Sequence, residues 1–214
     1  YMVDLKEFEQ KAADLRVLGM KISIGQDTVY EKYWDEDCRR NIYSASKSFT
    51  SCAVGFAVQE GLIDLDERLM DAFKEDIPNN PDENLKKATV KDLLTMTLGQ
   101  EKGFLMGKQR PRMEEQNWVK ASLAIPFVYE PGTHFVYNNV GPYLAGILVQ
   151  RRAGCDLLSY LTPRLLKPLG IRKTIWEVDP EGNTFGAGGL FLTVSELHKL
   201  GMFYLQNGCW NGKK

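Results

Sequence analysis

The chain has 214 residues, of which 43% are hydrophobic and 26% are charged. These fractions are ordinary for a globular protein and exclude a disordered, collagen-like or coiled-coil chain. The 27 basic and 28 acidic residues give a net charge of −1, which leaves no overall field to attract a polyanion. Composition therefore argues against nucleic acid or an anionic membrane as the partner, and no run approaches the roughly 18 apolar residues that a membrane span needs.

The beginning of the chain predicts one helix and one β-hairpin. Apolar side chains recur at helical spacing over residues 4–18. Residues 20–24 alternate between apolar and polar, a turn follows at Gly25, and residues 28–34 have the composition of a second strand. Two strands do not make a stable sheet by themselves. If the hairpin belongs to a larger sheet, we expect its other strands to lie outside these 214 residues.

The remainder of the chain predicts a mostly helical body. Residues 99–116 have little periodicity and are expected to form a long loop of the kind that often carries function. The run Gly186-Ala187-Gly188-Gly189 indicates a close approach of the backbone or a positive φ. Hydrophobic spacing, caps and helix breakers predict helices at residues 44–59, 89–97, 117–124, 140–152 and 156–166, and from a cap at Thr193 or Ser195 to about Asn207.

The tetrad Ser44-Ala45-Ser46-Lys47 lies where the strand region gives way to the first long helix. A serine at a helix start has its hydroxyl near free backbone N–H groups and the positive end of the helix dipole. A lysine three residues later lies one turn along the same face, and a buried lysine has a lowered pKa and can help to take the serine's proton. Taken alone, Ser44 is equally well a helix cap and Lys47 a solvated first-turn residue.

A second pair of candidate residues follows the turn at Pro131-Gly132. Tyr137 and Asn139 are two positions apart in an extended run, so their side chains point to the same side. A tyrosine phenolate beside a lysine can act as a general base, and an asparagine amide can orient a substrate carbonyl or the lysine. Without other evidence, a structural tyrosine and an asparagine that caps the next helix explain the pair better.

The order and spacing of these motifs resemble the serine β-lactamase and penicillin-binding-protein superfamily. Ser44-x-x-Lys47 is followed by Tyr137-x-Asn139, a tyrosine form that is similar to class C β-lactamases, DD-peptidases, carboxylesterases and aminohexanoate-oligomer hydrolases. The resemblance covers residues from about 20 to the end and implies an α+β, β-lactamase/transpeptidase-like fold, in which a helical body joins an antiparallel sheet that is incomplete here. Further matches are Gly61-Leu62-Ile63-Asp64-Leu65-Asp66, residues 89–97, Pro168-Leu169-Gly170, Gly188-Gly189-Leu190 and Thr193.

The resemblance also implies a role for each motif residue. Ser44 would be the acylated nucleophile, and its own N–H would be half of an oxyanion hole. Lys47 would ease removal of the serine proton, Tyr137 would be the general base, and Asn139 would bind the substrate and Lys47. The implied reaction is a two-step acyl transfer from amide or ester substrates such as peptides, small esters or β-lactams, with no metal or organic cofactor.

One departure from the family pattern concerns the third motif, Lys-Thr-Gly or His-x-Gly on an inner strand beyond Gly189. The Lys173-Thr174 pair precedes the Gly-Gly-Leu run and is followed by Ile175, so it does not match. We therefore expect a single domain, residues 1–214, that is truncated at its C-terminus. Residues 1–43 would hold the first helix and hairpin, residues 44–214 would hold the helical body, and the isolated chain would be poorly active or need the segment from elsewhere.

Two alternatives to a serine hydrolase or acyltransferase stay open. One is a catalytically silent binding module or an incomplete fragment of such an enzyme. The other is a covalent penicillin-recognising sensor that is acylated but does not deacylate. The start of the chain, which is not a signal peptide, and the four cysteines favour a cytoplasmic location. The cysteines have no C-x-x-C pairing, which argues against a zinc site. Unpaired sheet edges could allow self-association.

Overall fold

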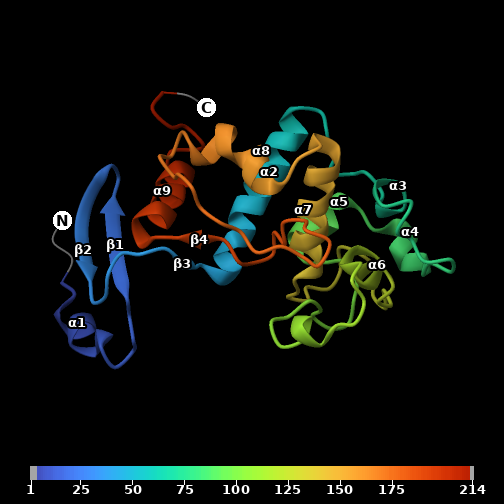
Figure 1. The fold of residues 1–214 in the computed structure, drawn as a ribbon, viewed down its shortest axis with the longest axis horizontal. Coiled ribbons are helices and arrows are strands. Elements are labelled where there is room, and N and C mark those ends of the chain that lie inside the picture. Colours follow the sequence, from blue (N-terminus) through green and yellow to red (C-terminus); the bar gives the residue numbers. More distant parts are fainter. Residues whose placement is uncertain (1–3, 213–214) are drawn as a thin grey trace. The chain divides into compact units, whose positions relative to one another are not determined.

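The computed structural model describes residues 4–212 (Figure 1). Contacts divide the described chain into two compact units. The first consists of residues 4–41, 165–174 and 191–212, and the second of residues 42–164 and 175–190. Among the described helices, none combines the length and apolar character that crossing a membrane requires.

The first unit is built on the predicted hairpin. Strand β1 (Gly19–Ile24) pairs antiparallel with β2 (Asp27–Tyr33), and the short strands β3 (Arg40–Asn41) and β4 (Phe191–Leu192) form a second two-stranded sheet. Helix α9 (Val194–Leu205) packs against β1. The predicted cap of α9 is confirmed at Thr193, whose hydroxyl accepts from the Glu196 N–H. The hairpin prediction is confirmed, and each strand end lies within one residue of its predicted position.

The prediction of one helix over residues 4–18 is wrong. Helix α1 covers only Lys6–Ala12, and Arg16 has a left-handed backbone with φ 53°. Leu15 and Leu18 are 64% and 44% exposed, although the periodic pattern placed them on a buried face. Only Ala12 of the helix is buried. A short helix with little tertiary packing is marginal in water, which explains why the chain turns early.

The second unit has a helix at its centre. In α7 (Val140–Ala153) every residue from Val140 to Gln150 is buried, and α7 packs against α2 (Ser46–Gln59) and α5 (Val90–Thr95) (Figure 1). Gly141 allows the close approach to α5, because a Cβ there would lie 2.2 Å from the Leu93 carbonyl oxygen. The helix predicted at residues 89–97 is α5, and it begins with a capping box in which Asp92 accepts from the Thr89 N–H at 2.9 Å.

Shorter helices and a loop complete the second unit, and a π-helical turn leads from it into residues 165–174 of the first unit. The expected helix over 156–166 is α-helical only as far as Leu161 and then forms a π-helical turn, because Pro163 has no N–H to donate to the preceding turn. Residues 99–116 form the expected loop apart from one 3₁₀ turn at Arg110–Arg112. The other helices are α3 (Leu69–Ala72), α4 (Glu83–Lys87), α6 (Trp118–Leu123) and α8 (Leu157–Leu161).

Candidate active site

The four residues that the sequence singles out meet in the second unit. Lys47 lies in the first turn of α2, and its Nζ is 3.2 Å from the Ser44 Oγ and 2.7 Å from the Asn139 Oδ1. The centroid of the Tyr137 ring is 5.2 Å from the same Nζ. Ser44 is exposed and Tyr137 is 44% exposed, so solvent reaches both residues. A serine, a lysine, a tyrosine and an asparagine therefore share one place on the surface.

The acceptors around Lys47 determine which side of its amine faces the serine. Besides Ser44 and Asn139, the Lys47 Nζ donates to the Ala187 carbonyl oxygen at 2.6 Å. The Asn139 Oδ1 and the Ala187 oxygen can only accept, so each requires an N–H from the lysine. The third position on the nitrogen is left for the Ser44 Oγ and for Tyr137, which also hydrogen-bonds Lys47. When Lys47 is neutral, that position holds the lone pair, which is the arrangement that a base needs.

The local electrostatics favour the basic forms of Lys47 and Tyr137. Burial lowers the pKa of Lys47 below its ordinary value of 10.5, and the positive charge of Arg110 lowers it further, while Tyr137 acts in the opposite direction. Burial raises the pKa of Tyr137. A hydrogen bond with Ser44 and the charge of Lys47 outweigh that effect, so the pKa of Tyr137 lies below its ordinary value of 10.0. Both groups can thus lose a proton more easily than in water.

The turn that presents Ser44 is held by one buried hydroxyl group. Ser44 lies in the 3₁₀ turn Tyr43–Ala45, just before α2, and Tyr43 has a left-handed backbone with φ 47°. The buried Ser46 hydroxyl donates to the Tyr43 carbonyl at 2.6 Å and accepts from the Leu190 N–H at 3.1 Å. An unusual backbone conformation of a non-glycine residue persists only when its surroundings impose it, and such positions cluster at functional sites. The nucleophile candidate is therefore rigidly presented.

Asn139 is oriented by the loop of residues 99–116. Its Nδ2 donates to the Leu105 carbonyl at 2.9 Å, which leaves its Oδ1 to accept from Lys47. Leu105 is fully buried with φ 56°. Although Asn139 directly precedes α7, its side chain makes no capping hydrogen bond there. The reading of Asn139 as a helix cap is thus wrong, and so is the reading of Lys47 as a solvated residue.

Sequence reasoning missed three parts of this site. The Ala187 carbonyl is a backbone group, so no side-chain pattern could reveal it, although the glycine-rich run around it predicted a close approach. Ser46 occupies one of the two unspecified positions of the Ser-x-x-Lys motif. Arg110 lies in a loop without periodicity, where nothing in the sequence relates it to Lys47.

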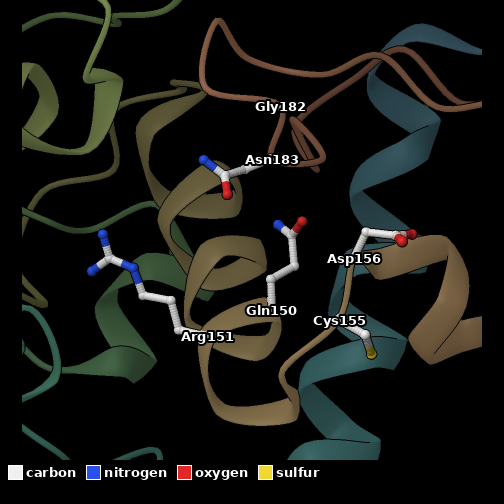
Figure 2. Close-up of a pocket in the computed structure, with 6 residues that line it drawn as sticks. All are labelled: Gln150, Arg151, Cys155, Asp156, Gly182 and Asn183. Atoms are coloured by element: carbon white, nitrogen blue, oxygen red, sulfur yellow. The ribbon is translucent and has the colours of Figure 1, made fainter.

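A second candidate lies at the end of α7, where an open pocket of about 290 Å³ is lined by polar residues (Figure 2). The Gln150 side chain bonds the backbone of Gly146 and Thr184, which occupies both its amide nitrogen and its oxygen. The Asp156 carboxylate caps α8 through the N–H and hydroxyl of Ser159. These side chains of the pocket thus make hydrogen bonds within the protein, and we assign the pocket no function. Its lining residues are Gln150, Arg151, Cys155, Asp156, Gly182 and Asn183.

Comparisons with solved structures identify the fold. The chain resembles the octameric penicillin-binding protein homologue from Pyrococcus abyssi with a TM-score of 0.76 and 22% identity, over 96% of this chain and 57% of the other. It resembles the LovD6 mutant of simvastatin synthase from Aspergillus terreus with a TM-score of 0.67 and 21% identity, over 94% of this chain and 65% of the other. At such identities the likeness concerns the fold alone.

Similar sequences include fungal acyltransferases and an esterase. Monacolin J acid methylbutanoyltransferase from Aspergillus terreus is 31% identical over 157 residues, which are 64% of this chain and 37% of that protein. Lovastatin esterase from Penicillium rubens is 31% identical over 150 residues, 60% of this chain and 37% of the esterase. The aligned part is thus little more than a third of each of these relatives.

The family model described as Beta-lactamase matches residues 6–208. The match extends over both units, from α1 to the residues after α9, and includes Ser44, Lys47, Tyr137 and Asn139. The resemblance inferred from the motifs is confirmed at the level of the family and of its fold. This chain belongs to the beta-lactamase family and has a β-lactamase/transpeptidase-like fold.

Proposed function

We propose that the chain carries the acylation site of a serine hydrolase or acyltransferase, with Ser44 as the nucleophile. The observation that supports this most directly is the Lys47 amine, which lies 3.2 Å from the Ser44 Oγ while two obligate acceptors occupy its other positions. A neutral amine held in this way is a base within reach of the serine proton. The lowered pKa values of Lys47 and Tyr137 point in the same direction.

In the proposed first step, the Ser44 Oγ attacks the carbonyl carbon of an ester or amide while its proton passes to Lys47 or Tyr137. The new bond joins the Oγ to the acyl carbon, and the bond from that carbon to the leaving group breaks as the leaving group takes the proton. The Ser44 N–H is one donor for the oxyanion. In the second step, water or an acceptor hydroxyl attacks the acyl carbon while its proton passes to Lys47 or Tyr137. The bond between the acyl carbon and the Ser44 Oγ then breaks, and the Oγ takes that proton.

Tyr137 and Asn139 have separate roles in this proposal. Tyr137 shares the proton with Lys47, and because the ring is partly exposed, it can also deprotonate the incoming water or alcohol. Asn139 keeps Lys47 in place through its Oδ1, and we propose that it also contacts the amide or ester side of a substrate. We assign no metal and no organic cofactor to the reaction.

The test is intact-mass spectrometry of the protein after incubation with a fluorophosphonate and, separately, with a penicillin. We expect one adduct on the wild-type chain and none on Ser44→Ala. Ser48→Ala is the matched control, because it removes an exposed hydroxyl from the first turn of α2, four residues after Ser44, and leaves Lys47 in place. No adduct on folded wild-type protein would favour a catalytically silent binding module instead.

The relatives suggest which substrates to try first. One is named for transfer of a methylbutanoyl group and another for cleavage of lovastatin, so we propose esters of short, branched acyl groups. Release of p-nitrophenol from a short-chain ester, with and without an added alcohol, separates hydrolysis from acyl transfer. A faster release with alcohol indicates a transferase. An adduct that persists for hours without release would indicate the sensor alternative.

A further inference from the structure

The loop of residues 99–116 contacts the surroundings of Lys47 at two separate points. Near its start, the Leu105 carbonyl accepts from the Asn139 amide, and a Cβ on Gly103 would lie 2.7 Å from the Tyr137 carbonyl oxygen. Further along, Arg110 forms an ion pair with Glu177. The loop thus connects the residue that orients Lys47 on one side to residues 175–190, which supply the Ala187 carbonyl on the other.

Arg110 is held more tightly than an ordinary surface arginine. Its side chain is only 19% exposed, its guanidinium carbon lies 4.3 Å from the centroid of the Phe185 ring, and its NH1 donates to Glu177. Its Nε is buried and has no hydrogen-bond partner among the described residues. An unsatisfied buried donor costs stability, so stability alone is a poor explanation for this placement. The planar guanidinium, stacked and paired, is suited to fixing a geometry.

Glu177 is bound to the glycine-rich segment by its backbone. Its N–H donates to the Gly189 carbonyl at 2.9 Å, and its own carbonyl accepts from the Phe185 N–H at 2.8 Å. A Cβ at Gly189 would lie 2.3 Å from the Glu177 Cβ, and Gly189 has φ 81°, so only glycine fits beside this glutamate. Ala187 lies between Phe185 and Gly189. A displacement of Glu177 would therefore displace the Ala187 carbonyl.

We propose that the Arg110–Glu177 ion pair is a positioning pair, which holds two of the acceptors of Lys47 at a fixed separation. The inference rests on the proposed function, because it assigns the pair a task in activating Ser44. The contacts form a closed ring within the second unit, and without the ion pair the loop and the glycine-rich segment can move apart. The ring runs through Lys47, Asn139, Leu105, Arg110, Glu177, Gly189 and Ala187.

The first test is the rate at which a fluorophosphonate labels Ser44 in variants of the pair. We expect Arg110→Met and Glu177→Gln each to slow labelling at least about tenfold, since small displacements of catalytic groups have large effects on rate. The double variant should be no slower than the slower single variant, because both break one contact. Arg110→Lys should recover part of the rate. Arg112→Met, an exposed arginine in the same turn, should label at the wild-type rate.

The second test reports on the pair independently of Ser44. Trace acetylation of Lys47, followed by peptide mass spectrometry across pH, gives the pKa of the amine. The charged and titratable groups that face Lys47 are Tyr137 and Arg110, with Ser44 as a neutral neighbour. Removing the positive charge in Arg110→Met should raise the pKa of Lys47, and Arg112→Met should not. Hydrogen exchange of residues 99–116 and 175–190 should be faster in Arg110→Met and Glu177→Gln.

The outcomes separate this inference from the proposed function. Unchanged labelling together with an unchanged pKa of Lys47 would overturn the positioning role, even if hydrogen exchange became faster and showed the pair to be a loop anchor. If the wild-type chain is not labelled at all, the proposed function fails. The acetylation profile of Glu177→Gln then decides on its own, because this variant breaks the pair and keeps the charge of Arg110: a shifted pKa of Lys47 supports the pair, and an unchanged pKa overturns it.

Discussion

At the scale of single residues, the chemistry of the candidate site depends on the hydrogen-bond partners of Lys47. Ser44, Lys47, Tyr137 and Asn139 could be predicted from the sequence because each is a side chain with its own chemistry, at a spacing that resembles a family. The Ala187 carbonyl could not, since every residue has one. Arg110 and Glu177 could not either, because 67 residues separate them and neither belongs to a motif.

The first prediction at this scale concerns the pH dependence of Ser44 labelling. The rate should rise with pH as Lys47 and Tyr137 lose their protons, and because the pKa values of both are lowered, the midpoint should lie below the range that is ordinary for a lysine or a tyrosine. The two groups are coupled, so the midpoint belongs to the pair. Labelling rates between pH 6 and 10.5 test this. A rate that does not change with pH would contradict the proposed base. In a separate variant, Tyr137→Phe should slow labelling by about 10²-fold.

At the scale of helices and strands, local patterns predicted the elements whose stability is local. The hairpin β1–β2 and the capped helices α5 and α9 have short-range signals, namely alternation, a turn residue and a capping box. Residues 4–18 have a helical pattern, yet only Lys6–Ala12 form a helix, because burial of the apolar face depends on the rest of the fold. Helices α3 and α4 are too short for periodicity to reveal them.

The contact of α7 with α5 gives a prediction about stability. Gly141→Ala should destabilise the fold by about 1–3 kcal/mol, since the added Cβ would lie 2.2 Å from the Leu93 carbonyl oxygen and backbone would have to move. Gly55→Ala is the matched control, because Gly55 is an exposed helical glycine with no atom within 4 Å of the added Cβ. It should stabilise the fold by about 0.5–1 kcal/mol. Urea unfolding of both variants measures the difference, and equal effects would contradict the packing described for α7.

The contact of α9 with β1 predicts a dependence of stability on pH. His198 Nε2 lies 2.9 Å from the Ser23 Oγ, and burial, with the charge of Lys21, lowers the pKa of His198 below 6.5. The unfolded chain therefore protonates His198 more readily than the folded chain does. The contribution of neutral His198 to folding stability is complete above pH 6.5, and it is lost as the pH falls towards the lower pKa of the folded state. The melting temperature of His198→Gln should therefore fall less between pH 7.5 and pH 5.5 than that of the wild-type chain.

The control for this histidine is His134→Gln, which removes an exposed histidine from the other unit. The melting temperature of this control should fall by as much as that of the wild-type chain over the same pH range. If His198→Gln and the wild-type chain lose equal amounts, carboxylates rather than His198 cause the dependence on pH.

At the scale of the whole molecule, the chain spans 37% of the length of the first curated relatives that it matches, and each of its two described sheets has two strands. We propose that residues 1–214 form one family domain whose sheet and third motif are completed by a further C-terminal segment. The sequence indicates this in two ways, because the predicted hairpin has too few strands for a stable sheet and the resemblance lacks its third motif.

The corresponding prediction compares acylation with turnover. The 214-residue chain should be labelled at Ser44, but its turnover of short esters should be at least about tenfold slower than that of the same chain with a family C-terminal segment appended, because the second oxyanion donor is worth about 10²- to 10³-fold. Steady-state kinetics of the two proteins measure the ratio. Unchanged turnover in the extended chain would show that residues 1–214 are sufficient.

The measurement to make first is intact-mass spectrometry of the 214-residue chain after exposure to the fluorophosphonate, with Ser44→Ala and Ser48→Ala beside it. A single adduct on the wild-type chain and on Ser48→Ala, absent from Ser44→Ala, is the predicted result and would identify Ser44 as an activated nucleophile. An adduct that persists in Ser44→Ala, or no adduct on folded wild-type protein, would contradict the assignment of Ser44 and of the Lys47 amine that faces it.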